Sequence, residues 1–221
     1  PGAYESGFPC LGSCYKLRHY YFISLPSTVR EIADYAFRDV SRLASLNISS
    51  GLTKIGKEAF KGCEYLMDID IPSSVTEIGE QAFNLCMRLR SIKIPQGITE
   101  IRSATFYKCL SLTSIDIPSS VTKIGRSAFY GCSSLTSIDI PSGVTEIGED
   151  AFCGCSSLAI SLEIPQGITE IGEYTFSGCS SLTSIEIPSS VTKIGKGAFS
   201  GCSRNLTSIT VETNNPRYDS R

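Results

Sequence analysis

The chain has 221 residues, of which 41% are hydrophobic and 19% charged, and its formal net charge is −2. No basic stripe interleaved with aromatic residues occurs, so the composition argues against nucleic acid as a partner. No run of eighteen apolar residues occurs either, and no segment is predicted to span a membrane. The first residues, Pro1 to Tyr4, lack the basic and apolar regions of a secretion signal, so we expect that any such signal was removed or was never part of this chain.

The first nineteen residues differ from everything that follows. Residues 1–19 contain Gly, Pro, Tyr and two cysteines, Cys10 and Cys14, and they end on the only histidine, His19. We expect this segment to form an irregular N-terminal cap, because the first strand of a stack otherwise exposes its edge. A disulfide between Cys10 and Cys14 is possible in an oxidising compartment.

Residues 20–205 consist of eight copies of a unit of 23 or 24 residues. One copy runs from Leu112 to Ser134, and the next, starting at Leu135, is nearly the same. A unit this short cannot bury its own apolar face, so the copies must stack on one another and form a solenoid. We predict a strand-dominated superhelix of about eight layers, roughly 40 Å long at ~4.8 Å per layer.

Each unit begins with a pattern typical of a half-buried strand. In the copy at Leu112, the apolar residues Ile115 and Ile117 alternate with polar ones and Pro118 follows. Alternation with period two places the isoleucines on one face, and β-branched residues favour extended backbone. Proline has no N–H to donate to a ladder and ends the strand. We expect these strands to pair in parallel from copy to copy.

The rest of the unit predicts two further sides of each layer. Residues 121–124 read Val-Thr-Lys-Ile and indicate a second short strand, after which Gly125 either adopts a positive φ or makes room for a close approach. Ala128 and Phe129 indicate a helical or 3₁₀ turn. One such phenylalanine per copy predicts a continuous stack of rings in the core.

Seven of the ten cysteines occupy one position of the unit. A disulfide framework, metal sites and a ladder of buried thiols are the alternatives. The buried ladder is favoured, because neighbours ~4.8 Å apart exceed the Cβ separation of a disulfide and paired zinc-ligand spacing is missing. Cys153 is expected to be an exposed or half-exposed free thiol, with no histidine near it in sequence. The seven repeated cysteines are Cys63, Cys86, Cys109, Cys132, Cys155, Cys179 and Cys202.

The end of the chain leaves the pattern. Residues 206–221 begin a partial ninth repeat and then diverge from the pattern at Asn214–Tyr218. The sequence stops abruptly at Arg221. Two copies carry one extra residue, within 158–162 and within 202–206. We expect each extra residue to form a small bulge in a loop, since a slip within a strand would turn its core face outward.

The sequence gives no sign of catalysis. Apart from His19 there is no histidine, and no G-x-S-x-G, phosphate-binding loop, G-x-G-x-x-G or H-E-x-x-H motif is present. We therefore predict a non-enzymatic protein with no catalytic residue, cofactor or metal.

The polar residues between the inward isoleucines form two columns on the predicted sheet, one rich in serine and one mostly acidic. A solvated face and a docking surface for a basic or hydroxyl-rich partner are both open interpretations. The second strand of each copy carries one glutamate or lysine, and opposite charges are often neighbours across layers, which we interpret as a feature of the scaffold. The candidate partner-binding residues are Asp70, Lys93, Ser114, Asp116, Ser137, Asp139, Glu163 and Glu186.

Over about residues 20–212 the order I-P-x-x-V-T-x-I-G-x-x-A-F-x-x-C resembles the BspA-like (Treponema pallidum-type) leucine-rich repeat. This resemblance implies a curved leucine-rich-repeat solenoid with the Leu-x-x-Ile-x-Ile strands on its concave side. It also implies a surface or secreted protein of bacteria or anaerobic protists, associated with adhesion to host matrix proteins and with no catalytic residues.

Our functional hypothesis is a protein-binding or adhesion module at the cell surface or in secreted form, acting through the concave face. Its partner would be a host extracellular-matrix or cell-surface protein, and the chain is expected to be a monomer. The alternative is a passive spacer or stalk that carries other domains.

Overall fold

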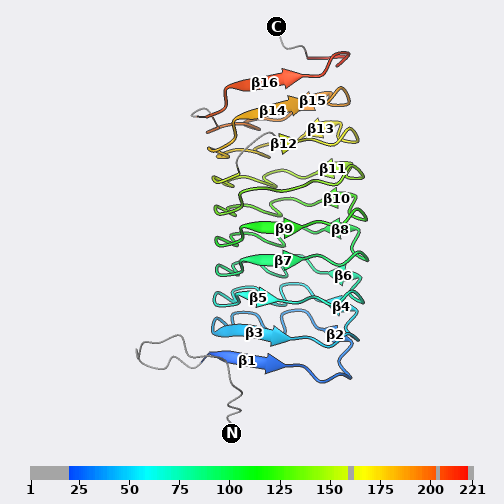
Figure 1. The fold of residues 1–221 in the computed structure, drawn as a ribbon, viewed down its shortest axis with the longest axis vertical. Coiled ribbons are helices and arrows are strands. Elements are labelled where there is room, and N and C mark those ends of the chain that lie inside the picture. The colour runs from blue at the N-terminus through cyan, green and yellow to red at the C-terminus, as the bar shows by residue number, and fades with distance from the viewer. Residues whose placement is uncertain (1–19, 159–161, 203–204, 219–221) are drawn as a thin grey trace.

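The computed structural model describes residues 20–158, 162–202 and 205–218. Successive turns of the chain lie one above another, and most turns contain a main strand on one side and a two-residue strand on a second side (Figure 1). The predicted strand-dominated solenoid is confirmed. The N-terminal cap and both predicted bulges concern residues 1–19, 159–161 and 203–204, which lie outside the described residues.

The main strands pair in parallel, one repeat apart. Their ladders run β1-β3-β5, β7-β9 and β12-β14-β16, and the layer at 135–140 between β9 and β12 has no strand. The expectation that the strands of every copy pair is therefore wrong: the ladder is interrupted between β5 and β7 and again at 135–140. Only the second interruption lies next to a copy with an extra residue, which can disrupt a ladder locally. The main strands are β1 (Tyr21–Ser24), β3 (Leu43–Asn47), β5 (Asp68–Ile69), β7 (Ser91–Lys93), β9 (Ser114–Asp116), β12 (Leu162–Glu163), β14 (Ser184–Ile187) and β16 (Ser208–Val211).

The second side of the solenoid consists of two-residue parallel strands. Each ends on an isoleucine that points inward, and its preceding Glu or Lys points outward. Opposite charges meet across layers, as predicted, with Nζ–Oε1 distances of 3.1 Å for Lys123–Glu146 and 2.6 Å for Lys193–Glu170. The strands are β2 (Glu31–Ile32), β4 (Lys54–Ile55), β6 (Glu77–Ile78), β8 (Glu100–Ile101), β10 (Lys123–Ile124), β11 (Glu146–Ile147), β13 (Glu170–Ile171) and β15 (Lys193–Ile194).

The Ala-Phe segment forms turns, and the predicted helical or 3₁₀ turn is wrong: the described residues contain no helix. Lys61 N–H donates to Glu58 O within the turn at 3.2 Å, whereas Phe60 N–H donates to Ala82 O of the next layer at 2.8 Å. Donors that alternate between the turn and the next layer cannot form consecutive helical bonds. Glu58 accordingly has a left-handed φ of 52°.

The phenylalanine stack is confirmed. Neighbouring rings have centroids 5.4–5.8 Å apart and planes within 11° of parallel. The two end rings are half-buried and the six between them are buried, so the stack runs through the core. The stacked rings are Phe37, Phe60, Phe83, Phe106, Phe129, Phe152, Phe176 and Phe199.

The repeated glycine after the second strand serves a close approach between layers. Gly125 does not have a positive φ, and a Cβ placed on it would lie 2.7 Å from Ser103 N and 2.8 Å from Arg102 C. The second of the two alternatives is therefore correct, because backbone from the preceding layer occupies the space of a side chain.

The buried ladder of seven thiols is also confirmed. Each of these cysteines is free and buried, and its Sγ donates to a phenylalanine carbonyl of the preceding layer, as Cys132 does to Phe106 O at 3.1 Å. Burial raises the pKa of these thiols, including Cys132. Cys153 is free and half-exposed, as predicted, whereas Cys10 and Cys14 lie outside the described residues.

Iodoacetamide labelling of the folded protein is expected to modify Cys153 and to spare Cys132 until the protein unfolds. Partial burial, and secondarily the Asp150 carboxylate, raise the pKa of Cys153 above its usual value of 9.0. Thiolate is the reactive species, so labelling at about pH 8 should be slow and should accelerate as the pH rises above the ordinary pKa. Peptide mass spectrometry over a pH series measures the labelling rate of each cysteine and its dependence on pH. Native-state labelling of Cys132 as fast as that of Cys153 would contradict the buried ladder.

Candidate functional site

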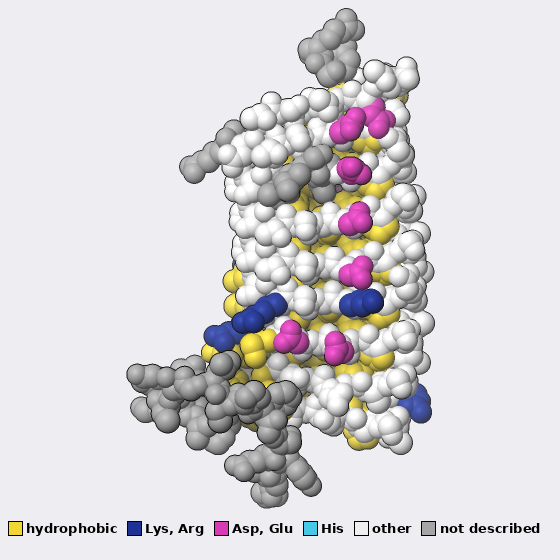
Figure 2. Space-filling model, in the orientation of Figure 1, with side chains coloured by type: hydrophobic (Ala, Val, Ile, Leu, Met, Phe, Trp, Pro, Cys, Tyr) yellow, Lys and Arg dark blue, Asp and Glu magenta, His cyan; other side chains and the backbone are white. Residues whose placement is uncertain are grey.

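The eight candidate residues all lie exposed on one surface, the outward side of the main strands, which we call the sheet face. Alternation along an extended backbone explains this: in β9, Ile115 points into the core while Ser114 and Asp116 point out. Figure 2 shows the result, a column of acidic side chains along the stack interrupted by one basic side chain.

The candidate residues fall into two groups along the sheet face. Asp70, Lys93, Ser114 and Asp116 line a shallow hollow of about 270 Å³ near β7 and β9. Asp139, Glu163 and Glu186 line a larger groove of about 580 Å³ that extends toward the C-terminal end, and Ser137 lines neither. The predicted site is therefore two neighbouring surfaces of different charge.

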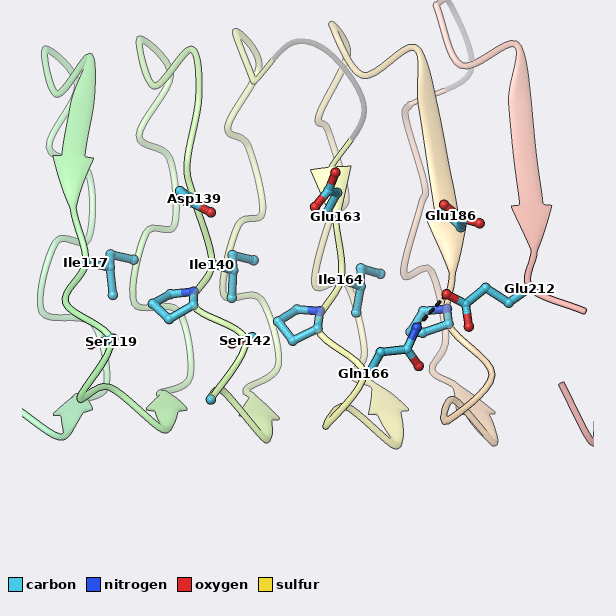
Figure 3. A pocket seen from close by; sticks show the side chains of 14 residues that line it. Ile117, Ser119, Asp139, Ile140, Ser142, Glu163, Ile164, Gln166, Glu186 and Glu212 are labelled. Carbon is cyan, nitrogen blue, oxygen red and sulfur yellow. Dashed lines mark hydrogen bonds between the residues drawn. The ribbon is translucent and has the colours of Figure 1, made fainter. Parts of the chain in front are cut away.

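The larger groove, hereafter the acidic groove, combines carboxylates with an apolar floor (Figure 3). Ile117, Ile140 and Ile164 contribute to the floor and keep 8%, 7% and 7% of their surface exposed. The prolines that end the strands line it beside them. Asp139 and Glu163 directly precede Ile140 and Ile164 in the chain, so these two layers each present one isoleucine and one carboxylate to the groove, and Glu186 adds a carboxylate from the next layer.

Glu212 belongs to the acidic groove, although it was not among the predicted residues. Its carboxylate accepts a hydrogen bond from the Gln166 amide (Figure 3). It accepts a second from the backbone N–H of Ser189 at 2.9 Å. The Ser189 N–H is the main reason why the pKa of Glu212 lies below its ordinary value. The sequence could have indicated Glu212 through its place in the repeat. Val211 pairs with Ile187, which Pro188 follows, so Glu212 occupies the position at which earlier copies have proline.

The carboxylates of the acidic groove differ electrostatically from those of the second side. Within the described part of the chain, no lysine or arginine nitrogen lies within 4.0 Å of Asp139, Glu163 or Glu186. On the second side, by contrast, Lys123 lies 3.1 Å from Glu146 and 4.0 Å from Glu100. Among the described residues, the groove therefore carries negative charge with no cation within 4.0 Å of these three carboxylates.

Neither a metal site nor a membrane-crossing helix occurs in the described part of the chain. Across residues 20–158, 162–202 and 205–218, no three His, Cys, Asp or Glu side chains come together in a way that could hold a metal ion. In the same ranges, no helix has the length and apolar character needed to cross a membrane.

Parallel strands stacked at one repeat, a phenylalanine stack and a buried thiol ladder define a leucine-rich-repeat solenoid. The chain belongs to the BspA type leucine rich repeat family, whose repeat region, in six copies, matches residues 12–133 and 99–220. Leucine-rich repeats are generally non-enzymatic and generally mediate protein interactions. No relative was found among the curated proteins.

Two crystal structures are similar to this chain over most of its length. The leucine rich repeat protein of T. pallidum is 30% identical with a TM-score of 0.57, covering 85% of this chain and 79% of that one. A leucine rich cell surface protein of Faecalibacterium prausnitzii is 28% identical with a TM-score of 0.57, covering 90% of this chain and 70% of that one.

Proposed function

We propose that this protein is a non-enzymatic protein-binding module that acts in adhesion and contacts its partner through the sheet face. The observation that carries the proposal is the charge on that face. Among the described residues its carboxylates form no ion pair within 4.0 Å, whereas the second side pairs Lys54 with Glu31 at 3.1 Å and Lys193 with Glu170 at 2.6 Å. Unpaired charges on a rigid surface favour electrostatic recognition of a partner.

The location and the partner class form part of the same proposal. The similar protein of Faecalibacterium prausnitzii is described as a cell surface protein, which supports a cell-surface or secreted location for this chain. The partner would be a host extracellular-matrix or cell-surface protein, bound by a monomer. Residues 1–19 would cap the solenoid, 20–205 would form its eight repeats, and 206–221 would begin a ninth.

Charge reversal on the sheet face tests this function. The triple variant Asp116→Lys, Asp139→Lys and Glu163→Lys is expected to lose most of its binding to immobilised fibronectin, laminin or collagen. Reversing three exposed charges replaces attraction by repulsion at the interface and should change affinity by about tenfold or more. Surface plasmon resonance at low and high salt measures the loss.

A matched control reverses three carboxylates on another side. Glu80, Glu149 and Glu173 are exposed and recur at one position of the unit, away from the main strands. Their triple replacement by lysine should leave binding unchanged, and thermal melts of both variants check folding. Equal binding by the wild type and the sheet-face variant would instead favour the passive spacer.

A further inference from the structure

We infer that the acidic groove binds an extended cationic segment of the partner, in which lysines or arginines are separated by proline or other apolar residues. This inference rests on the proposed function and adds the place and the chemistry of the contact. The groove runs along the stack from the layer of β9 to that of β16, beside the main strands (Figure 3).

The floor of the groove favours a partner with apolar surface. Ile117 and Ile140 are among the most exposed of the core side chains, at 8% and 7%, whereas the core residue Phe129 is at 0%. Pro141, which is half-buried, extends the same apolar strip. A chain lying on this strip would remove the remaining apolar surface from water.

The carboxylates select a positive charge. Asp139, Glu163 and Glu186 are exposed and have no cation within 4.0 Å among the described residues. Glu212 is fixed at one end by the Ser189 N–H, and its lowered pKa keeps it ionised. Like charges in adjacent layers repel one another, and a cation between them relieves that repulsion.

The smaller hollow does not offer the same selectivity. There Lys93 is the register partner of Asp116, and Asp70 lies on its other side. Cation and carboxylates are interleaved in that hollow, so an incoming lysine would meet repulsion as well as attraction. The acidic groove is thus the part of the sheet face that fits a cationic partner.

Spacing defines the conformation that fits. Equivalent carboxylates two layers apart, such as Asp139 and Glu186, are separated by roughly 9.6 Å, since strands lie ~4.8 Å apart. A polyproline II segment rises ~3.1 Å per residue with three residues per turn, so side chains three apart recur every ~9.3 Å on one face. In an extended strand, side chains on one face recur about every 6.6–6.8 Å, and this distance does not match the separation of the carboxylates.

The probe is a fluorescent peptide of four Pro-Pro-Lys units, measured by anisotropy with the full chain. We expect saturable binding that weakens with salt. The double variant Glu163→Lys and Glu186→Lys should bind at least about tenfold more weakly. The control Glu80→Lys and Glu173→Lys, with the same change of charge, should bind like the wild type. Equal weakening in both variants, or none in the first, would overturn the groove assignment.

A second peptide tests the spacing. The same eight prolines and four lysines, with the lysines placed together at one end, should bind more weakly than the repeated units. Equal or tighter binding would overturn the polyproline II match. If neither peptide binds while the sheet-face triple variant still loses matrix protein, the inference on the groove fails and the proposed function stands.

Discussion

Replacing Phe129 by alanine is expected to lower the free energy of unfolding by about 3–5 kcal/mol. The ring is buried and lies between Phe106 and Phe152, with both centroids 5.4 Å away. The cavity cannot close by moving the layers together, because Phe129 N–H bonds to Ala151 O at 2.8 Å and fixes the spacing. Urea denaturation followed by circular dichroism measures the loss.

The adjacent residue provides the control. Tyr130 also stacks, on Tyr107 with centroids 4.8 Å apart, but it is only half-buried. Tyr130→Ala should therefore cost less, about 1 kcal/mol, because water can fill the space left by the ring. Similar losses for the two variants would show that the buried stack does not carry the stability of the solenoid.

The parts of the fold that the sequence predicts are those that a single repeat already contains. The position of Phe129 and Cys132 follows from their recurrence, since a residue repeated in every copy stacks on itself. The segment at Ala128 was predicted to be helical because an adjacent small and aromatic residue are compatible with a helix and with a non-helical turn alike. The difference is where the N–H groups go: the Phe129 N–H bonds to Ala151 in the next layer, which no single copy reveals.

The candidate site also has a part that the sequence predicts and a part that it does not. The exposure of Asp139, Glu163 and Glu186 followed from strand alternation and is confirmed. Glu212 was missed because its role depends on Gln166, 46 residues earlier, two layers away on the stack. Alternation along a strand also does not predict where the surface is hollowed. The hollow around Lys93 and the groove around Glu163 depend on how the layers pack.

Gly125→Ala is expected to destabilise the protein by about 1–3 kcal/mol, although it adds a single methyl group. That methyl would lie 2.7 Å from Ser103 N and 2.8 Å from Arg102 C, and both are backbone atoms that no rotamer change can move. Arg102 itself occupies the glycine position of the preceding copy, with its guanidinium 3.0 Å from Glu77. One layer of the protein thus accommodates a side chain at the glycine position, and this limits the expected loss of stability.

Gly143 is the matched control for this substitution. A Cβ there would have its nearest neighbour, Ser119 O, at 3.6 Å, which is ordinary contact, and its φ is not positive. Gly143→Ala should stabilise by about 0.4–1 kcal/mol, because alanine reduces the conformational freedom of the unfolded chain. Thermal melts should therefore move in opposite directions for the two variants. A shift of the same sign and size would mean that the layers can separate to admit a methyl group, and that the close approach does not explain the recurring glycine.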